Sequence, residues 1–174
     1  MIRIITFLVL VGLSFPTLSH DQAAYIVGSV GGQRIDDVDD FSFDNAAGFT
    51  IGTGYAWPRF SIDLNYYYAL EADFYVDNII EGEVEISIVY LMGRFHIPVG
   101  DKVEFTIGAG FGRGEFDIDI DGFGSESESE NSELYEIGLN YYFQTNMGLI
   151  VNWRKFPFLE TDIDVISVGI EYKF

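Results

Sequence analysis

The chain has 174 residues, enough for one domain with a sizeable core, and its 28 acidic residues against 9 basic ones give a formal net charge of -19. That charge repels nucleic-acid phosphates and argues against a nucleic-acid-binding role. Hydrophobic residues make up 48% and aromatic residues 17%, whereas disordered acidic chains lack both, so the chain is expected to fold. With no cysteine, a disulfide, a thiolate metal site and a cysteine nucleophile are excluded.

The first nineteen residues have the pattern of an export signal. Arg3 supplies a basic start, an apolar run over 4–13 follows, and Thr17 and Ser19 place small residues where a signal peptidase requires them. The apolar run is too short for a spanning helix, which needs about 20 residues. We therefore expect residues 1–19 to be a signal peptide and residues 20–174 to be the mature domain.

Alternation of apolar with small or polar residues predicts eight strands in the mature domain. The fifth is the clearest, because Phe105 and Ile107 alternate with Thr106, Gly108 and their neighbours. The predicted strands span about 23–32, 48–57, 60–68, 84–93, 103–112, 135–143, 147–154 and 166–174.

The connections between these strands alternate in length. Long connections at about 33–46, 69–83, 115–133 and 155–164 carry most of the acidic residues, and all of them fall at one end of an up-and-down sheet. An eight-stranded barrel is just wide enough inside for side chains, so glycines and a few charges fit the interior while large apolar side chains face lipid. We therefore predict an all-β fold, an eight-stranded antiparallel up-and-down transmembrane β-barrel.

The last strand supports this prediction, because Asp164–Phe174 alternates in polarity and ends on an aromatic residue. It resembles the closing strand of outer-membrane barrels, and 48–55 and 105–112 resemble the glycine-rich strands of the OmpA/OmpX-like, "porin family", eight-stranded barrels. The resemblance implies a bacterial outer-membrane location and recognition of the closing strand by the outer-membrane assembly machinery. Barrels of this kind place short turns in the periplasm and long loops outside the cell.

Several charged residues fall on the small-residue face and are predicted to point into the barrel. Buried charges must be paired, so we favour a structural network over a gate that opens a narrow cation path. Arg94 and Arg113 fall in the outward register near strand ends. The predicted interior residues are Asp63, Glu85, Glu104, Glu136, Arg154, Glu171 and Lys173.

One acidic stretch matches the spacing of a calcium-binding loop. Asp117, Asp119 and Asp121 occupy its first, third and fifth positions, and Glu128 its twelfth. No predicted helices flank this stretch, and a Ser–Glu repeat supplies the last acid, so the alternative is a solvated face of a strand. Looser attraction of divalent cations, which would bridge the loops to lipopolysaccharide phosphates, is the interpretation we favour.

Nothing in the sequence indicates catalysis. His20 and His96 are the only histidines, and neither is predicted to form a Ser/His pair. We therefore expect a monomeric barrel without enzymatic activity or cofactor, embedded in outer-membrane lipid and lipopolysaccharide. Its expected role is structural and surface-interactive through its acidic loops, and the alternative is a low-conductance, cation-preferring pore for small ions.

Overall fold

The computed structural model describes residues 22–174 except 36–40, 44, 77–79, 121–123 and 159–160. The predicted signal peptide lies outside the described residues. Across the described part of the chain, no helix has the length and hydrophobicity needed to cross a bilayer.

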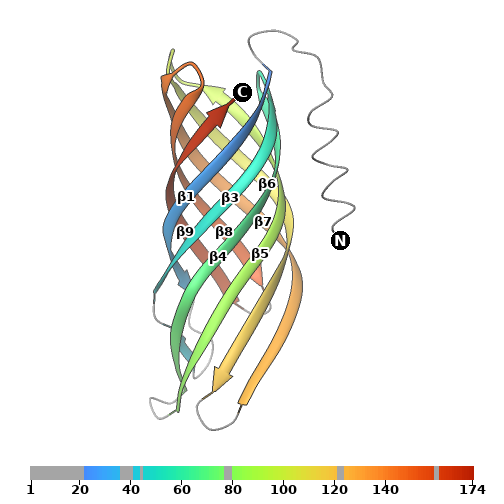
Figure 1. Ribbon diagram of the computed structural model, residues 1–174, viewed down its shortest axis with the longest axis vertical. Coiled ribbons are helices and arrows are strands. Elements are labelled where there is room, and N and C mark those ends of the chain that lie inside the picture. The colour runs from blue at the N-terminus through green and yellow to red at the C-terminus, as the bar shows by residue number, and fades with distance from the viewer. Residues whose placement is uncertain (1–21, 36–40, 44, 77–79, 121–123, 159–160) are drawn as a thin grey trace.

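Eight long strands close into an antiparallel barrel in the order β1-β3-β4-β5-β6-β7-β8-β9, with β9 paired back to β1 (Figure 1). The prediction of eight strands is confirmed, and the short β2 only extends one edge of β4. The strands of the described chain are β1 (Ala23–Ile35), β2 (Phe41–Phe43), β3 (Ala46–Trp57), β4 (Phe60–Val76), β5 (Ile80–Pro98), β6 (Val103–Ile120), β7 (Gly124–Gln144), β8 (Met147–Phe158) and β9 (Thr161–Lys173).

The two ends of the barrel differ. At one end, here called the turn end, short turns at 58–59, 99–102 and 145–146 join the strands. At the other, the projecting end, β4 to β7 extend beyond their neighbours, since they have 17 to 21 residues and the other barrel strands 12 or 13. The predicted long loops at 69–83 and 115–133 are therefore mostly strand. The polar residues of these segments are typical of a loop, which is why the sequence predicted one. Polar residues are also compatible with exposed, paired strands, and the structure pairs these segments in antiparallel ladders.

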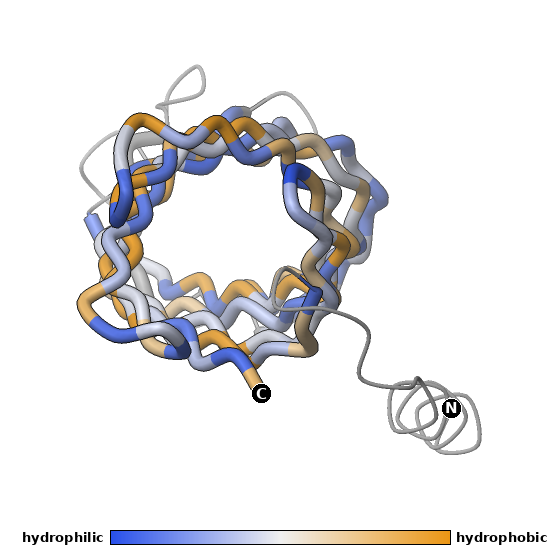
Figure 2. The backbone as a smooth tube through the Cα atoms, turned by 90° about the horizontal axis from the view of Figure 1, so that it is seen from above, coloured by the Kyte–Doolittle hydropathy of each residue, from blue (hydrophilic) through white to orange (hydrophobic). Residues whose placement is uncertain are grey.

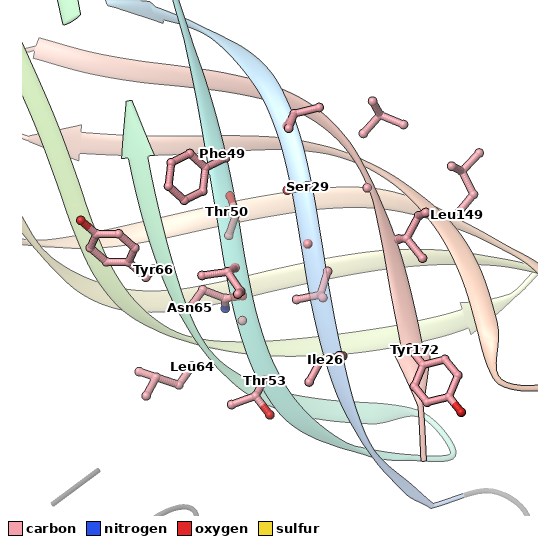
Figure 3. A pocket seen from close by; sticks show the side chains of 18 of the residues that line it. Ile26, Ser29, Phe49, Thr50, Thr53, Leu64, Asn65, Tyr66, Leu149 and Tyr172 are labelled. Carbon is pink, nitrogen blue, oxygen red and sulfur yellow. The ribbon is translucent and has the colours of Figure 1, made fainter. Parts of the chain in front are cut away.

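The outer surface of the barrel is apolar, and the view along the axis shows a closed ring (Figure 2). Large aliphatic and aromatic side chains such as Ile51, Leu91 and Phe111 are half-exposed on it, as lipid contact requires. Gly28 faces outward between Ile51 and Ile170, and its missing side chain contributes to an apolar depression of about 1070 Å³ on this surface (Figure 3).

Side chains fill the interior of the ring, and they divide into two layers along the axis. The polar half, toward the turn end, contains buried charged and hydroxyl or amide side chains contributed by β1, β3, β4, β5, β6, β7, β8 and β9. The apolar half, toward the projecting end, is the continuous cluster Ile35, Ala46, Tyr67, Ala69, Val84, Ile86, Ile88, Tyr90, Met92, Phe116, Leu134, Phe156, Phe158, Ile163 and Val165.

Candidate functional site

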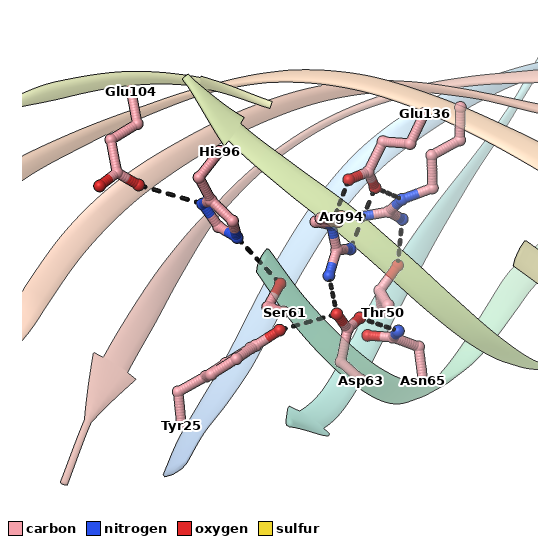
Figure 4. Close-up of polar contacts among 10 residues, drawn as sticks. Tyr25, Thr50, Ser61, Asp63, Asn65, Arg94, His96, Glu104 and Glu136 are labelled. Carbon is pink, nitrogen blue, oxygen red and sulfur yellow. Dashed lines mark hydrogen bonds and ion pairs between the residues drawn. The ribbon is translucent and has the colours of Figure 1, made fainter. Parts of the chain in front are cut away.

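Two arginines and two carboxylates form the centre of the polar half (Figure 4). The Arg94 guanidinium on β5 donates hydrogen bonds to both Asp63 on β4 and Glu136 on β7. Arg154 on β8 donates from Nε to Glu136 Oε2 at 2.5 Å. All four side chains are buried, and the two positive charges balance the two negative ones, as a buried ionic cluster requires.

Neutral polar side chains complete this network. Tyr25 on β1 donates its hydroxyl to Asp63 Oδ1 at 2.7 Å, and the Asn65 amide donates to the other carboxylate oxygen. Arg154 Nη1 donates to Thr50 Oγ1 on β3 at 2.9 Å. The contacts therefore join β1, β3, β4, β5, β7 and β8 across the barrel.

Gly108 on β6 explains how two bulky charged groups meet inside a narrow barrel. A Cβ atom at this position would lie 3.3 Å from Arg94 Cγ and 3.4 Å from Glu136 Cβ, and closer still to the Met92 sulfur. The bare backbone of β6 therefore leaves the volume that the Arg94–Glu136 pair occupies. A larger residue at this position would have to displace these side chains.

The predicted orientation of β5 was wrong. Arg94 points inward, whereas Glu85 lies in the outward register, directly across from Asp117 on β6. The pattern could not decide this, because residues 88–92 are apolar on both faces of the strand and Glu85 and Arg94 fall on opposite faces. The decisive factor is the pairing of Arg94 with the carboxylates of Asp63 and Glu136. Arg113 does face outward, where it donates to Ser129 Oγ at 2.7 Å.

The prediction that His96 lacks a serine partner was also wrong. His96 Nε2 lies 2.9 Å from Ser61 Oγ, and Nδ1 lies 3.1 Å from Glu104 Oε2. The three residues stand far apart in sequence but on the adjacent strands β4, β5 and β6, so only the register reveals the contact. Ser61 is 0% exposed, and its backbone is paired on both sides, with Ala56 on β3 and with Arg94 on β5.

The remaining predicted interior charges lie nearer the turn end. Glu171 accepts a hydrogen bond from the Tyr142 hydroxyl at 3.0 Å, and Lys173 Nζ lies 2.9 Å from the same hydroxyl. The structure thus joins Asp63, Glu136 and Arg154 in one network and places Glu104 and Glu171 in separate contacts. All of these side chains lie on the inward face of the barrel.

The apolar half fills the interior on the side of this network that faces the projecting end. The Tyr67 and Tyr90 rings pack against Phe156 with centroid distances of 5.9 and 5.6 Å, and Phe116 packs against Phe158 at 5.2 Å. These rings are buried or nearly so and come from β4, β5, β6 and β8. Between the two layers, Arg154 lies over the Tyr90 ring at 5.8 Å, so the polar and apolar halves are in direct contact.

The predicted calcium loop has a different geometry. Asp117 and Asp119 lie on β6 in the outward register, and Glu128 lies on the facing strand β7, opposite Phe116. Asp121 falls outside the described residues. Within the described ranges, no group of three or more ligating side chains is compact enough to hold a metal ion.

Instead, the carboxylates of the projecting end face each other in pairs. Glu83 lies directly across from Asp119, and Glu85 directly across from Asp117. Together with Ser125–Ser127 and Ile118 they line a polar depression of about 360 Å³ on the outer surface. Like charges at opposed positions destabilise a sheet, so this surface favours whatever cations approach it.

Comparison with known proteins identifies relatives in fold. A family model described as the outer membrane protein beta-barrel domain matches residues 5–174. Among solved structures, Ail of Yersinia pestis is 18% identical with a TM-score of 0.65, covering 88% of this chain and 99% of that one. The neisserial surface protein NspA is 13% identical with a TM-score of 0.71, covering 87% of this chain and 97% of that one. OprG of Pseudomonas aeruginosa is 14% identical with a TM-score of 0.64, covering 90% of this chain and 98% of that one. No curated protein matches the sequence.

Proposed function

The chain belongs to the outer membrane protein β-barrel family, and from this premise we propose that it is a monomeric, non-catalytic barrel with a structural and surface-interaction role. It is an outer-membrane protein of bacteria. The interacting surface in this proposal is the acidic outer face of the projecting end. Barrels of this class point their longer connections away from the periplasm, which puts that face outside the cell.

The opposed carboxylates of β5 and β6 carry this proposal. The pairs Glu83–Asp119 and Glu85–Asp117 each set like charges directly across a ladder, an arrangement that costs roughly 0.2–1 kcal/mol per pair. A surface that keeps four unneutralised acids is suited to binding cations, and its partners are divalent cations together with the phosphates of lipopolysaccharide that they bridge.

The same charge excludes direct binding of a polyanion. One structure of Ail contains the heparin analogue sucrose octasulfate. The outer face of the present barrel repels such a ligand unless a cation lies between them, so we do not extend that binding to this chain.

A thermal melt of the mature chain in lipopolysaccharide-containing vesicles tests the proposal. Calcium or magnesium should raise the melting temperature more than sodium at equal ionic strength. The variant Glu83→Gln/Glu85→Gln/Asp117→Asn/Asp119→Asn should lose that difference, while Asp101→Asn, at the turn end, should keep it. Equal responses of the wild type to sodium and to calcium would refute the cation role.

A low-conductance, cation-preferring pore is the alternative, and the filled interior speaks against it. The apolar half presents aromatic and aliphatic side chains to any ion that passes the Arg94–Glu136 pair. We expect stable insertion into a planar bilayer without discrete current steps. Cation-selective steps would establish the pore instead.

Two further proposals concern biogenesis. The segment 1–19 directs export, and its removal leaves the barrel domain 20–174. The closing strand β9, whose outward residues Ile166, Val168 and Ile170 precede Tyr172 and Phe174, is the segment that the assembly machinery recognises. Replacing Phe174 with Ser should slow assembly in cells without changing the stability of the refolded barrel.

A further inference from the structure

His96 lies between two groups of interior charges, one at the turn end and one at the centre of the polar half. On one side its Nδ1 lies 3.1 Å from Glu104 Oε2, and on the other its Nε2 lies 2.9 Å from Ser61 Oγ (Figure 4). The imidazole is 7% exposed, whereas the Glu104 side chain is 25% exposed. The histidine therefore exchanges protons with water on the Glu104 side, at the turn end.

These two contacts determine which ring nitrogen carries the hydrogen when the histidine is neutral. An ionised carboxylate only accepts hydrogen bonds, so Nδ1 carries the hydrogen and donates it to Glu104. Nε2 then has a free lone pair and accepts the hydroxyl hydrogen of Ser61. In the charged imidazolium both nitrogens donate. Ser61 must then accept from Nε2 and turn its own hydrogen to another acceptor.

The Tyr25 hydroxyl is in place to be that acceptor. It lies beside Ser61, with which it makes a side-chain hydrogen bond, and it donates its own hydrogen to Asp63 Oδ1 at 2.7 Å (Figure 4). Arg94 Nη1 donates to the same carboxylate oxygen. Hydrogen bonds in series polarise one another, so a tyrosine that accepts from Ser61 donates more strongly to Asp63. A change of charge at His96 thus reaches the central ionic network through two hydroxyl groups.

The balance of charge at the turn end favours a proton on His96. Among the described residues, the groups gathered there are the carboxylates Glu104 and Glu171 and the ammonium of Lys173. The uncharged Tyr142 hydroxyl lies between them, 3.0 Å from Glu171 Oε1 and 2.9 Å from Lys173 Nζ. The central network already has as many positive as negative groups. A proton on the histidine therefore supplies the positive charge that the two carboxylates lack.

We propose that His96, Ser61 and Tyr25 form a proton-sensing relay, through which acidification at the turn end strengthens the ionic network at the centre of the barrel. Histidine is the side chain that changes its charge between about pH 5 and about pH 8. In the acid form, hydrogen bonds run in one direction from the histidine to Asp63. In the neutral form, the Ser61 hydroxyl turns back to the histidine, and the chain of donors is broken at that point.

Nuclear magnetic resonance of the full chain, refolded in uncharged detergent micelles, tests the relay between about pH 5 and about pH 8. The ring carbons of His96 report its protonation, and the side-chain Nε–H of Arg94 reports the network. In the wild type, the Arg94 signal should shift with the same midpoint as the His96 signals. His96→Gln should abolish that shift, whereas His20→Gln, which removes the other histidine, should leave it unchanged.

Variants of the two hydroxyl groups separate the relay from a direct effect of charge. In Ser61→Ala and in Tyr25→Phe, His96 still titrates, but the hydrogen-bonded connection to Asp63 is cut. Each variant should lose most of the Arg94 shift, because only the field of the imidazolium remains. Circular dichroism and heat-modifiable gel mobility show which variants fold, and either one that folds decides the question. An Arg94 shift as large as in the wild type would reduce the effect to through-space electrostatics and overturn the proposal.

Unfolding kinetics give a second, independent measurement. The bound proton has its partners only in the folded barrel, so its stabilising effect is present at low pH and lost as the pH rises. The wild type should unfold more slowly at about pH 6 than at about pH 8, and His96→Gln should show a smaller ratio of the two rates. An equal ratio in the two proteins would overturn the proposal, because the titration of His96 would then have no influence on the barrel.

Discussion

The polar and apolar halves of the barrel interior are both filled with side chains, but different interactions hold the strands together in each half. In the polar half, six strands are joined by a few directional bonds centred on Asp63, Arg94, Glu136 and Arg154. In the apolar half, fifteen buried residues pack mainly by apolar contact, with one hydrogen bond from the Tyr67 hydroxyl to Gln33 Oε1 at 2.9 Å. The polar half therefore specifies which strands pair and in which register. The apolar half contributes buried apolar surface, which tolerates changes of side chain more readily.

This difference matches the shape of the molecule. The apolar half lies toward the end at which β4 to β7 extend past their neighbours, and all eight barrel strands contribute residues to it. Its large rings come from β4, β5 and β8, which the ionic network also joins, and from β6, which it does not. Damage in the two halves should consequently differ in size and in how readily a similar side chain repairs it.

The largest effect is expected for Glu136→Ala. This carboxylate accepts from both Arg94 and Arg154, so its removal leaves two buried guanidinium groups short of a counter-charge. Breaking a buried ion pair costs about 3–5 kcal/mol of unfolding free energy. Urea-induced unfolding in lipid vesicles measures the loss. Glu133→Ala, on the same strand but exposed, is the control and should stay within about 0.5 kcal/mol.

In the apolar half, Leu134→Ala should cost about 3 kcal/mol, since Leu134 is 0% exposed and a cavity would replace its side chain. Two conservative substitutions, one in each half, test the comparison further. Leu134→Met keeps the volume and should recover most of the loss, to within about 1.5 kcal/mol of the wild type. Glu136→Gln keeps the shape but not the charge, and should recover little. If Leu134→Met and Glu136→Gln recovered equal shares of the lost unfolding free energy, the proposed difference between the two halves of the interior would be contradicted.

A smaller effect is expected at the turn end. His96→Gln can keep one of the two contacts with Ser61 and Glu104, so we expect a loss of about 1 kcal/mol, comparable to one hydrogen bond. Ser61→Ala should give a similar loss. Because the Ser61 hydroxyl is buried, a fluorophosphonate probe should label neither the wild type nor the variants, and labelling of Ser61 would assign it a chemical role.

The sequence predicted the barrel because its information is repeated in every strand. The alternation along 103–112 and 147–154, the short turns and the closing strand all indicate one architecture, and an error in one element does not change it. It also predicted the inward positions of Asp63, Glu136 and Arg154, since each falls on the face of its strand opposite large apolar residues such as Ile62, Ile137 and Trp153.

The errors occurred where a strand gives no local signal. Residues 88–92 are apolar on both faces, so the position of Arg94 depends on partners in β4 and β7 that the pattern of one strand does not contain. The contact between Ser61 and His96 likewise follows from register alone. The hairpin of β6 and β7 was predicted as a loop because its residues are acidic and small, although their alternation suits a ladder.

The smallest net change is expected from the most extensive substitution, a replacement of the whole ionic network by apolar side chains. Removing one partner leaves charges unpaired, whereas removing all of them leaves nothing to desolvate, and such replacements are often neutral or stabilising. The stability of this variant should lie within about 2 kcal/mol of the wild type, far above that of Glu136→Ala. It combines Tyr25→Phe, Thr50→Val, Asp63→Leu, Asn65→Leu, Arg94→Met, Glu136→Leu and Arg154→Met.

If this variant is stable, what it loses identifies the role of the network. Directional bonds of the network favour one register among the strands that it joins, so the variant should refold into more than one species. Hydrogen exchange of β5 resolves this, because residues 88–92 are apolar on both faces and the contacts of Arg94 favour one orientation of the strand. A single, wild-type-like exchange pattern would mean that packing in the apolar half is sufficient to set the register of the whole barrel.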